Sequence, residues 1–131
     1  MIREEALRWF EEGENDISTA NILLEHKKYN PSAFYSQQAA EKILKGLLLA
    51  YNEATWGHSV LSLLRRLDEI IDVDISEAEQ CAKELDRHYI PSRYPDAYPS
   101  GRPEDYYTEK IAKEALTCAL KIKQFAQNLM R

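Results

Sequence analysis

The chain has 131 residues and a mass of 15.2 kDa, a length typical of one domain, so we expect a single domain over residues 1–131. Apolar residues make up 44% and charged residues 30% of the sequence, a balance that argues against disorder. The 22 acidic residues outnumber the 17 basic ones, giving a net charge of −5. Overall charge therefore cannot hold this protein on nucleic acid, and such binding would need a local basic patch.

The longest apolar run, residues 47–51, is far shorter than a membrane span, and the first residues lack the apolar core of a signal peptide. We therefore expect a soluble cytoplasmic protein without membrane contacts. Cys81 and Cys118 both fall at apolar positions of helical patterns, and neither has a cysteine or histidine at metal-ligand spacing. The sequence predicts two buried thiols, with no disulfide, no metal and no cofactor.

The first predicted helix has small and apolar residues at steps of three or four, which places them on one face. These residues are Ile2, Ala6, Trp9, Gly13, Ile17, Ala20 and Leu24. Glycine costs a helix up to about 1 kcal/mol relative to alanine. The close approach of a neighbouring helix would explain why Gly13 occupies this face.

The second predicted helix begins with Asn30 as N-cap and Pro31 at the first helical position, and it runs to about Tyr51. Its two adjacent apolar rows make it the central helix. Gln37 and Glu41 lie one turn apart within one row. They either bond to Tyr or Arg from a later loop or lie at the rim of the bundle, while Lys42 and Lys45 lie towards the polar edge.

Three more helices complete the predicted fold. Apolar spacing predicts a short helix over residues 60–71, and a second one that Ser76 caps and that continues to Tyr89. The last helix begins between residues 104 and 108 and continues to residue 129. We therefore expect an all-α protein, a compact antiparallel up-and-down bundle of about five helices.

Residues 87–103 break this pattern, because they contain four of the five prolines and should form a stiff, extended loop. The loop carries three arginines against one aspartate, a net charge of +2, and three interleaved tyrosines. Guanidinium groups bind phosphates and tyrosine rings stack on bases, but the same side chains also anchor a loop to a bundle. Composition leaves both roles open.

The histidines also have two interpretations each. His58 either packs with Trp56 at the entry to the third helix or faces a nucleotide. His88 is either a surface histidine at a helix end or an acid–base group beside Arg87. His26 ends the first helix, where a cation complements the helix dipole.

Four stretches together resemble the HEPN domain family, and the resemblance covers essentially the whole chain. They are ENDISTA at 14–20, AFYSQQAAEKILKGLL at 33–48, GHSVLSLL at 57–64 and SRYPDA at 92–97. The second and fourth are the more specific. The resemblance implies a five-helix bundle, commonly a dimer, that binds nucleotide or RNA. It also implies pairing with a separate minimal nucleotidyltransferase in a two-component, toxin–antitoxin-like system.

Many HEPN proteins are metal-independent ribonucleases with an Arg-x4–6-His motif, but no arginine of this chain has a histidine at that distance. The resemblance therefore favours a non-catalytic nucleotide-binding subunit. In it, Arg93 would contact phosphate, Tyr94 would stack or anchor, and Asp96 would orient Arg93 or accept from a ribose or base. Further nucleotide-binding candidates are Arg87 and His58 and, more weakly, Lys42 and Lys45. The alternatives are a ribonuclease that uses Arg93 with His88 and a homodimeric interaction module that binds no nucleotide.

Overall fold

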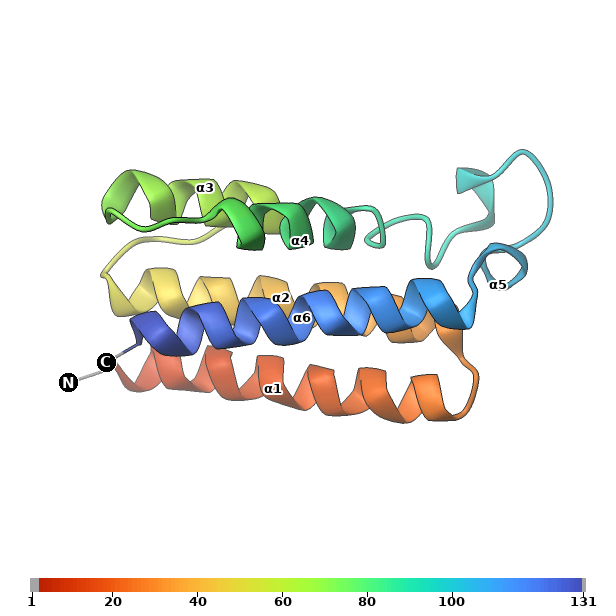
Figure 1. Ribbon diagram of the computed structural model, residues 1–131, viewed down its shortest axis with the longest axis horizontal. Helices are drawn as coiled ribbons and strands as arrows, with labels where there is room; N and C mark the ends of the chain where they lie inside the picture. Colours follow the sequence, from red (N-terminus) through yellow and green to blue (C-terminus); the bar gives the residue numbers. More distant parts are fainter. Residues whose placement is uncertain (1–2, 131) are drawn as a thin grey trace.

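The computed structural model describes residues 3–130, which form helices and no strand, so the all-α prediction is confirmed. Four helices of 11 to 22 residues are followed by two short helical turns and a final long helix (Figure 1). In chain order they are α1 (Glu4–Glu25), α2 (Tyr29–Ala50), α3 (Val60–Ile70), α4 (Ser76–Asp86), the 3-10 turn η1 (Pro95–Ala97), α5 (Pro103–Tyr106) and α6 (Glu109–Leu129).

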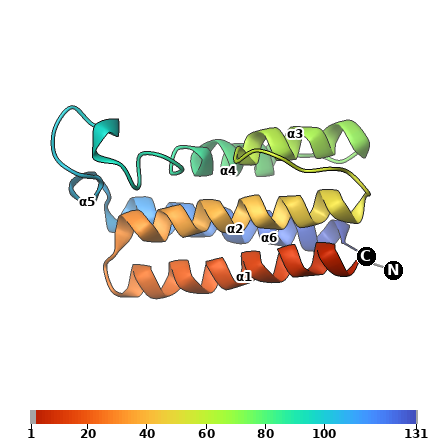
Figure 2. The same ribbon diagram turned by 180° about the vertical axis from the view of Figure 1, so that it is seen from behind.

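Helix α2 is the centre of the bundle. It lies antiparallel to α1, with α6 alongside both, while α3 and α4 cover its other side (Figures 1 and 2). Residues 51–59 run back along α2, so α3 points in the same direction as α2 rather than opposite to it. The buried leucines and isoleucine of α2 confirm its predicted central position in the bundle. They are Ile43, Leu44, Leu47 and Leu48.

Helices α1 and α2 approach closely because small residues face each other at seven-residue intervals. They are Ala6, Gly13 and Ala20 on α1 and Ser32, Ala39 and Gly46 on α2. A Cβ added at Gly13 would lie 2.9 Å from the Ala39 carbonyl oxygen, and one added at Gly46 would lie 2.8 Å from the Ala6 carbonyl oxygen. The Ser32 hydroxyl donates to the Ala20 carbonyl at 2.7 Å. The predicted explanation for Gly13 is therefore confirmed.

The buried face of α1 is rotated from the predicted one. Phe10 and Asp16 are buried, whereas Trp9, Ile17 and Leu24 are only partly buried. The close backbone approach accounts for this difference, because larger side chains fit only beside the line of small residues. Ile2 lies outside the described residues.

Two predicted helix caps differ from those in the structure. Asn30 is not the N-cap of α2, because the helix already begins at Tyr29. The Asn30 amide instead donates to the Ser92 carbonyl at 3.1 Å and ties the start of α2 to the proline-rich segment. Ser76 is the first residue of α4 rather than its cap, and the Asp74 carboxylate accepts from the Ser76 backbone at 2.9 Å.

The prediction of two free thiols is wrong, because Cys81 on α4 and Cys118 on α6 form a disulfide. Their Cα atoms are 4.9 Å apart, within the range that a disulfide spans. The two helices are antiparallel, and the Lys121–Glu77 ion pair at 3.9 Å marks the same register one turn away. Apolar spacing in the sequence placed each cysteine on the inner face of its helix. It could not show that the two cysteines lie opposite each other, because they are 37 residues apart and the register of α4 against α6 is not visible in either helix.

Within residues 3–130, no helix combines the length and the apolar character that crossing a membrane requires.

Candidate functional site

The proline-rich segment begins where α4 ends, and its first part is held against α2. After Asp86, backbone hydrogen bonds from Arg93 and Tyr94 to the Ile90 carbonyl close a tight turn. The Ser92 hydroxyl is buried and donates to the His88 carbonyl. Together with the hydrogen bond from the Asn30 side chain to the Ser92 carbonyl, these contacts fix the backbone that carries Arg93.

Arg93 lies in a cluster of aromatic rings. Its guanidinium carbon is 4.3 Å from the ring centre of Phe34, 4.8 Å from that of Tyr89 and 4.9 Å from that of Tyr94. Its Nε donates to the Tyr89 carbonyl at 2.9 Å. Among residues 3–130, no carboxylate pairs with this guanidinium. The side chain is therefore fixed in place while its terminal nitrogens keep their capacity to bind an anion.

His58 contacts the same Tyr89 ring. The two rings stack with centroids 4.9 Å apart and planes inclined by 16°, and the His58 side chain is 59% exposed. Its Nδ1 lies 3.3 Å from both carboxylate oxygens of Glu41. Because a carboxylate only accepts, Nδ1 carries the hydrogen in this contact, and Nε2 is the nitrogen that can face a ligand.

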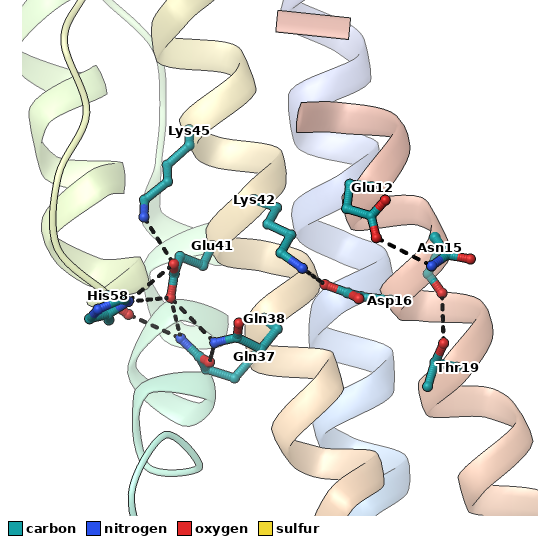
Figure 3. Close-up of polar contacts among 10 residues, drawn as sticks. All are labelled: Glu12, Asn15, Asp16, Thr19, Gln37, Gln38, Glu41, Lys42, Lys45 and His58. Carbon is teal, nitrogen blue, oxygen red and sulfur yellow. Dashed lines mark hydrogen bonds and ion pairs between the residues drawn. The ribbon is translucent and has the colours of Figure 1, made fainter. Parts of the chain in front are cut away.

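Glu41 is the buried centre of a polar network on α2 (Figure 3). Its carboxylate accepts from Lys45 Nζ at 2.9 Å and from Gln37 Nε2 at 3.2 Å. Gln37 Nε2 also donates to the His58 carbonyl at 3.0 Å, and Gln38 contributes a weaker contact. The network therefore holds both the backbone and the ring of His58.

These partners differ from those predicted for Gln37 and Glu41. The bonds go to His58 and Lys45, not to a Tyr or Arg of the later loop, and both residues are buried rather than at the rim. The return of residues 51–59 along α2 is the reason, because it brings His58 to the level of Glu41. The contact predicted between His58 and Trp56 is replaced by the stack on Tyr89, while Trp56 packs on Arg66 with 3.9 Å between the guanidinium carbon and the ring centre.

Asp86 positions the start of α3 directly after His58. Its carboxylate accepts from the Ser59 hydroxyl at 2.8 Å and from the backbone nitrogens of Val60 at 2.7 Å and Leu61 at 3.2 Å. A carboxylate at a helix N-terminus satisfies free N–H groups and complements the helix dipole. The end of α4 thus supports both the backbone that follows His58 and the segment that carries Arg93.

The first interpretation of His88, a surface histidine at a helix end, is wrong, because His88 is only 5% exposed. Its Nδ1 lies 2.8 Å from the Tyr107 hydroxyl and its Nε2 lies 3.1 Å from the Glu84 carboxylate. Burial lowers the pKa of His88, so the ring is neutral with its hydrogen on Nε2 towards Glu84. Burial also raises the pKa of Tyr107, whose protonated hydroxyl donates to Nδ1. Both ring nitrogens are therefore engaged within the fold.

The remaining predicted site residues are spread over the surface. Lys42 pairs with the buried Asp16 of α1 at 2.7 Å, on the face of α2 away from His58 (Figure 3), and burial raises the pKa of Asp16. Arg87 is exposed and pairs with Glu84 at 3.7 Å. Asp96 is exposed on η1 and makes no ion pair with Arg93 within the described chain. Tyr94 is 46% exposed and, unlike these residues, its ring contacts the Arg93 guanidinium.

Arg93, Tyr94 and His58 are therefore brought together, and Lys42, Arg87 and Asp96 lie outside their cluster. Tyr89, one of the three interleaved tyrosines, contacts both the guanidinium and the imidazole, whereas Phe34, the other ring beside the guanidinium, was not predicted as a site residue. Phe34 is one turn before Gln38 on α2, so its place in the second motif of the resemblance was the only available signal.

Comparison with protein-family models matches the HEPN domain to residues 6–129. The chain belongs to the HEPN domain family. A protein from Methanocaldococcus jannaschii strain DSM 2661, named "Putative toxin MJ1304", is 25% identical over 126 residues, or 90% of this chain and 83% of that protein.

Solved structures also resemble this HEPN protein. TT1696 from Thermus thermophilus is 42% identical with a TM-score of 0.92, covering 97% of this chain and 99% of that one. ST0689, described as an archaeal HEPN homologue, is 36% identical with a TM-score of 0.82, and the match covers 100% of both chains. The HEPN domain protein TM0613 from Thermotoga maritima is 32% identical with a TM-score of 0.74, covering 94% of this chain and 97% of that one.

Proposed function

We propose that this HEPN protein is a nucleotide- or RNA-binding subunit of a toxin–antitoxin-like pair and that it binds its ligand at Arg93. The observation that carries the proposal is the fixed guanidinium with no carboxylate partner among residues 3–130. A guanidinium that is already ordered binds phosphate at little cost in side-chain entropy. Exposed Tyr94 supplies a ring for base stacking, and His58 a second polar group.

The proposed partner is a separate minimal nucleotidyltransferase, and the protein itself is proposed to act as a homodimer. The name of the Methanocaldococcus jannaschii relative supports the toxin part of this proposal. The partner part rests on the family resemblance of the four sequence stretches. A tagged pull-down from the native cell extract, with the proteins identified by mass spectrometry, tests it. A small nucleotidyltransferase in the eluate supports the pair, and its absence removes that part of the proposal.

Arg93→Ala is expected to weaken binding of a short, labelled single-stranded RNA by roughly tenfold, because one charge-assisted contact to phosphate is lost. The slope of log affinity against log salt should decrease by about 0.7, the value for one phosphate contact to a single strand. Fluorescence anisotropy across a salt series measures both quantities, and an ATP titration measures mononucleotide binding.

Arg102→Ala is the matched control, because it removes the same charge from the same segment. Arg102 is exposed and pairs with Glu104 and Asp105 instead of contacting the aromatic cluster. Equal affinity and equal salt slope in the Arg93 and Arg102 variants would remove Arg93 from the site. No binding of RNA or ATP by the unmodified protein, together with a dimer in sedimentation, would favour the homodimeric interaction module instead.

A metal-independent ribonuclease is the second candidate function, and the His58–Glu41 contact favours it. His58 Nε2 could take the proton of a ribose 2′-hydroxyl while the 2′-oxygen attacks phosphorus. The bond to the 5′-oxygen then breaks, and that oxygen takes the proton back from His58. The products are a 2′,3′-cyclic phosphate and a 5′-hydroxyl. Arg93 would stabilise the charge on the phosphorane, and Glu41 would keep Nε2 turned towards the ligand.

His58→Ala is expected to reduce RNA cleavage in the presence of a chelator by roughly a hundredfold, the usual contribution of one acid–base group. Gel analysis of end-labelled RNA measures the rate and the cyclic phosphate end. His26→Ala is the control, because His26 is exposed at the end of α1 and, among residues 3–130, forms no hydrogen bond or ion pair with Glu41. Cleavage that survives in the His58 variant, or no cleavage of varied RNAs by the unmodified protein, would reject this candidate.

A further inference from the structure

The Cys81–Cys118 disulfide joins α4 to α6 next to a surface cavity. The cavity has a volume of about 470 Å³, and charged side chains of both helices line it, among them Glu84 and Lys113. Cys118 is partly exposed on the cavity side, whereas Cys81 is buried. Both cysteines line the cavity and Cys118 is only partly buried, so we expect a reactant to approach the bond from this side.

Helix α4 connects this disulfide to the candidate site through its last turn. Glu84, three residues after Cys81, bonds to His88, and Asp86 caps α3 directly after His58. The chain then continues into the turn that carries Tyr89 and Arg93. A displacement of α4 relative to α6 would therefore be transmitted to both the imidazole and the guanidinium of the site.

Few bonds join α4 and α6 themselves apart from the disulfide, and the His88–Tyr107 hydrogen bond joins the segments just beyond the two helices. Between α4 and α6, the described residues show one ion pair, Lys121–Glu77, at 3.9 Å, and its two side chains are mostly exposed. An exposed ion pair of this kind adds little to stability. Buried apolar contacts of Ala78, Ala82 and Leu85 remain, but they permit sliding more readily than a covalent bond does.

We propose that the Cys81–Cys118 disulfide is a redox-controlled link that holds α4 on α6 and keeps the Arg93 segment in its ordered geometry. A dithiol reductant opens it. One thiolate of the reductant attacks the Cys118 sulfur, the S–S bond breaks and Cys81 leaves as a thiolate. The second thiol of the reductant then resolves the mixed disulfide. The protein gains two electrons and two protons as two thiols, and the reductant ends as a disulfide.

The structural part of this proposal is independent of any ligand, whereas its effect on RNA affinity rests on the proposed function. Hydrogen exchange of the oxidised and the dithiothreitol-treated protein separates the two. On reduction, exchange of the Arg93 and Tyr94 amides should accelerate by roughly tenfold more than exchange of amides in the middle of α1. The melting temperature should fall by roughly 10 °C, because the link closes a long loop in the unfolded chain.

The amides of α1 are the internal control. If they and the Arg93 amide accelerate by the same factor, the disulfide stabilises only against global unfolding, and the proposal is wrong. Thiol alkylation before reduction is a second test. Two alkylated cysteines in protein purified without reductant would show that the disulfide does not form. The Cys81→Ser/Cys118→Ser variant should reproduce the exchange of the reduced protein and should not respond to dithiothreitol.

RNA affinity is measured on the same samples. Weaker binding after reduction, with faster local exchange, extends the proposal to regulation of the site. Faster local exchange with no binding of RNA or ATP in either state would overturn the proposed function and leave the redox link standing. Unchanged local exchange overturns the redox link whatever the affinity.

Discussion

Replacing Gly46 with alanine is expected to lower the free energy of unfolding by about 2 kcal/mol, although alanine is the better helix former by about 1 kcal/mol. The added Cβ would lie 2.8 Å from the Ala6 carbonyl oxygen and 3.2 Å from both the Phe10 nitrogen and the Trp9 Cβ. Two of these atoms belong to the backbone of α1, which cannot move without separating the two helices. The steric cost therefore exceeds the gain in helix propensity.

Urea denaturation followed by circular dichroism measures this change. Ser18→Ala is the matched control, because Ser18 is exposed on α1 and its replacement also introduces alanine into a helix without touching α2. That variant should be as stable as the unmodified protein or slightly more stable. A Gly46 variant that gained stability in the same way would show that the close approach of α1 and α2 tolerates a methyl group.

Periodicity alone was enough to predict the long helices, because each buries one face and the spacing of that face is visible in the sequence. Gly13 even indicated the close helix contact. The rotation of α1 towards Phe10 and Asp16 could not be predicted, since it depends on which small residues of α2 face it. Likewise, the pairing of Cys81 with Cys118 depends on the register of α4 against α6, which neither helix encodes by itself.

The candidate site divides in the same way. The unusual composition of residues 87–103 drew attention to Arg93 and Tyr94, which are indeed neighbours in the structure. The role of Glu41 was hidden, because it depends on the path of residues 51–59 back along α2 to His58. Asp96 shows that proximity in sequence does not ensure contact in the fold. It is three residues from Arg93 in sequence, but the turn at η1 leaves it exposed without contact to the guanidinium.

His88→Ala is expected to lower the free energy of unfolding at neutral pH by about 3 kcal/mol, because it leaves the buried Tyr107 hydroxyl without its partner and creates a cavity. The pH dependence should change as well. Burial lowers the pKa of His88 below its ordinary value of 6.5, so the unfolded chain takes up a proton at a higher pH than the folded protein. Stability is therefore full above pH 6.5 and is lost as the pH falls below it, a loss that the variant should lack.

Urea titrations between neutral pH and about pH 5 measure this difference, with His26→Ala as the control for loss of an exposed imidazole. A double-mutant cycle with Tyr107→Phe isolates the hydrogen bond, and the two changes should be non-additive by about 1 kcal/mol or more. Strict additivity would contradict the assigned contact.

The same variants decide between the two histidines as acid–base groups. A folded His88 variant that still cleaves RNA, beside a His58 variant that does not, would assign the chemistry to His58, because only its Nε2 is free to reach a ligand.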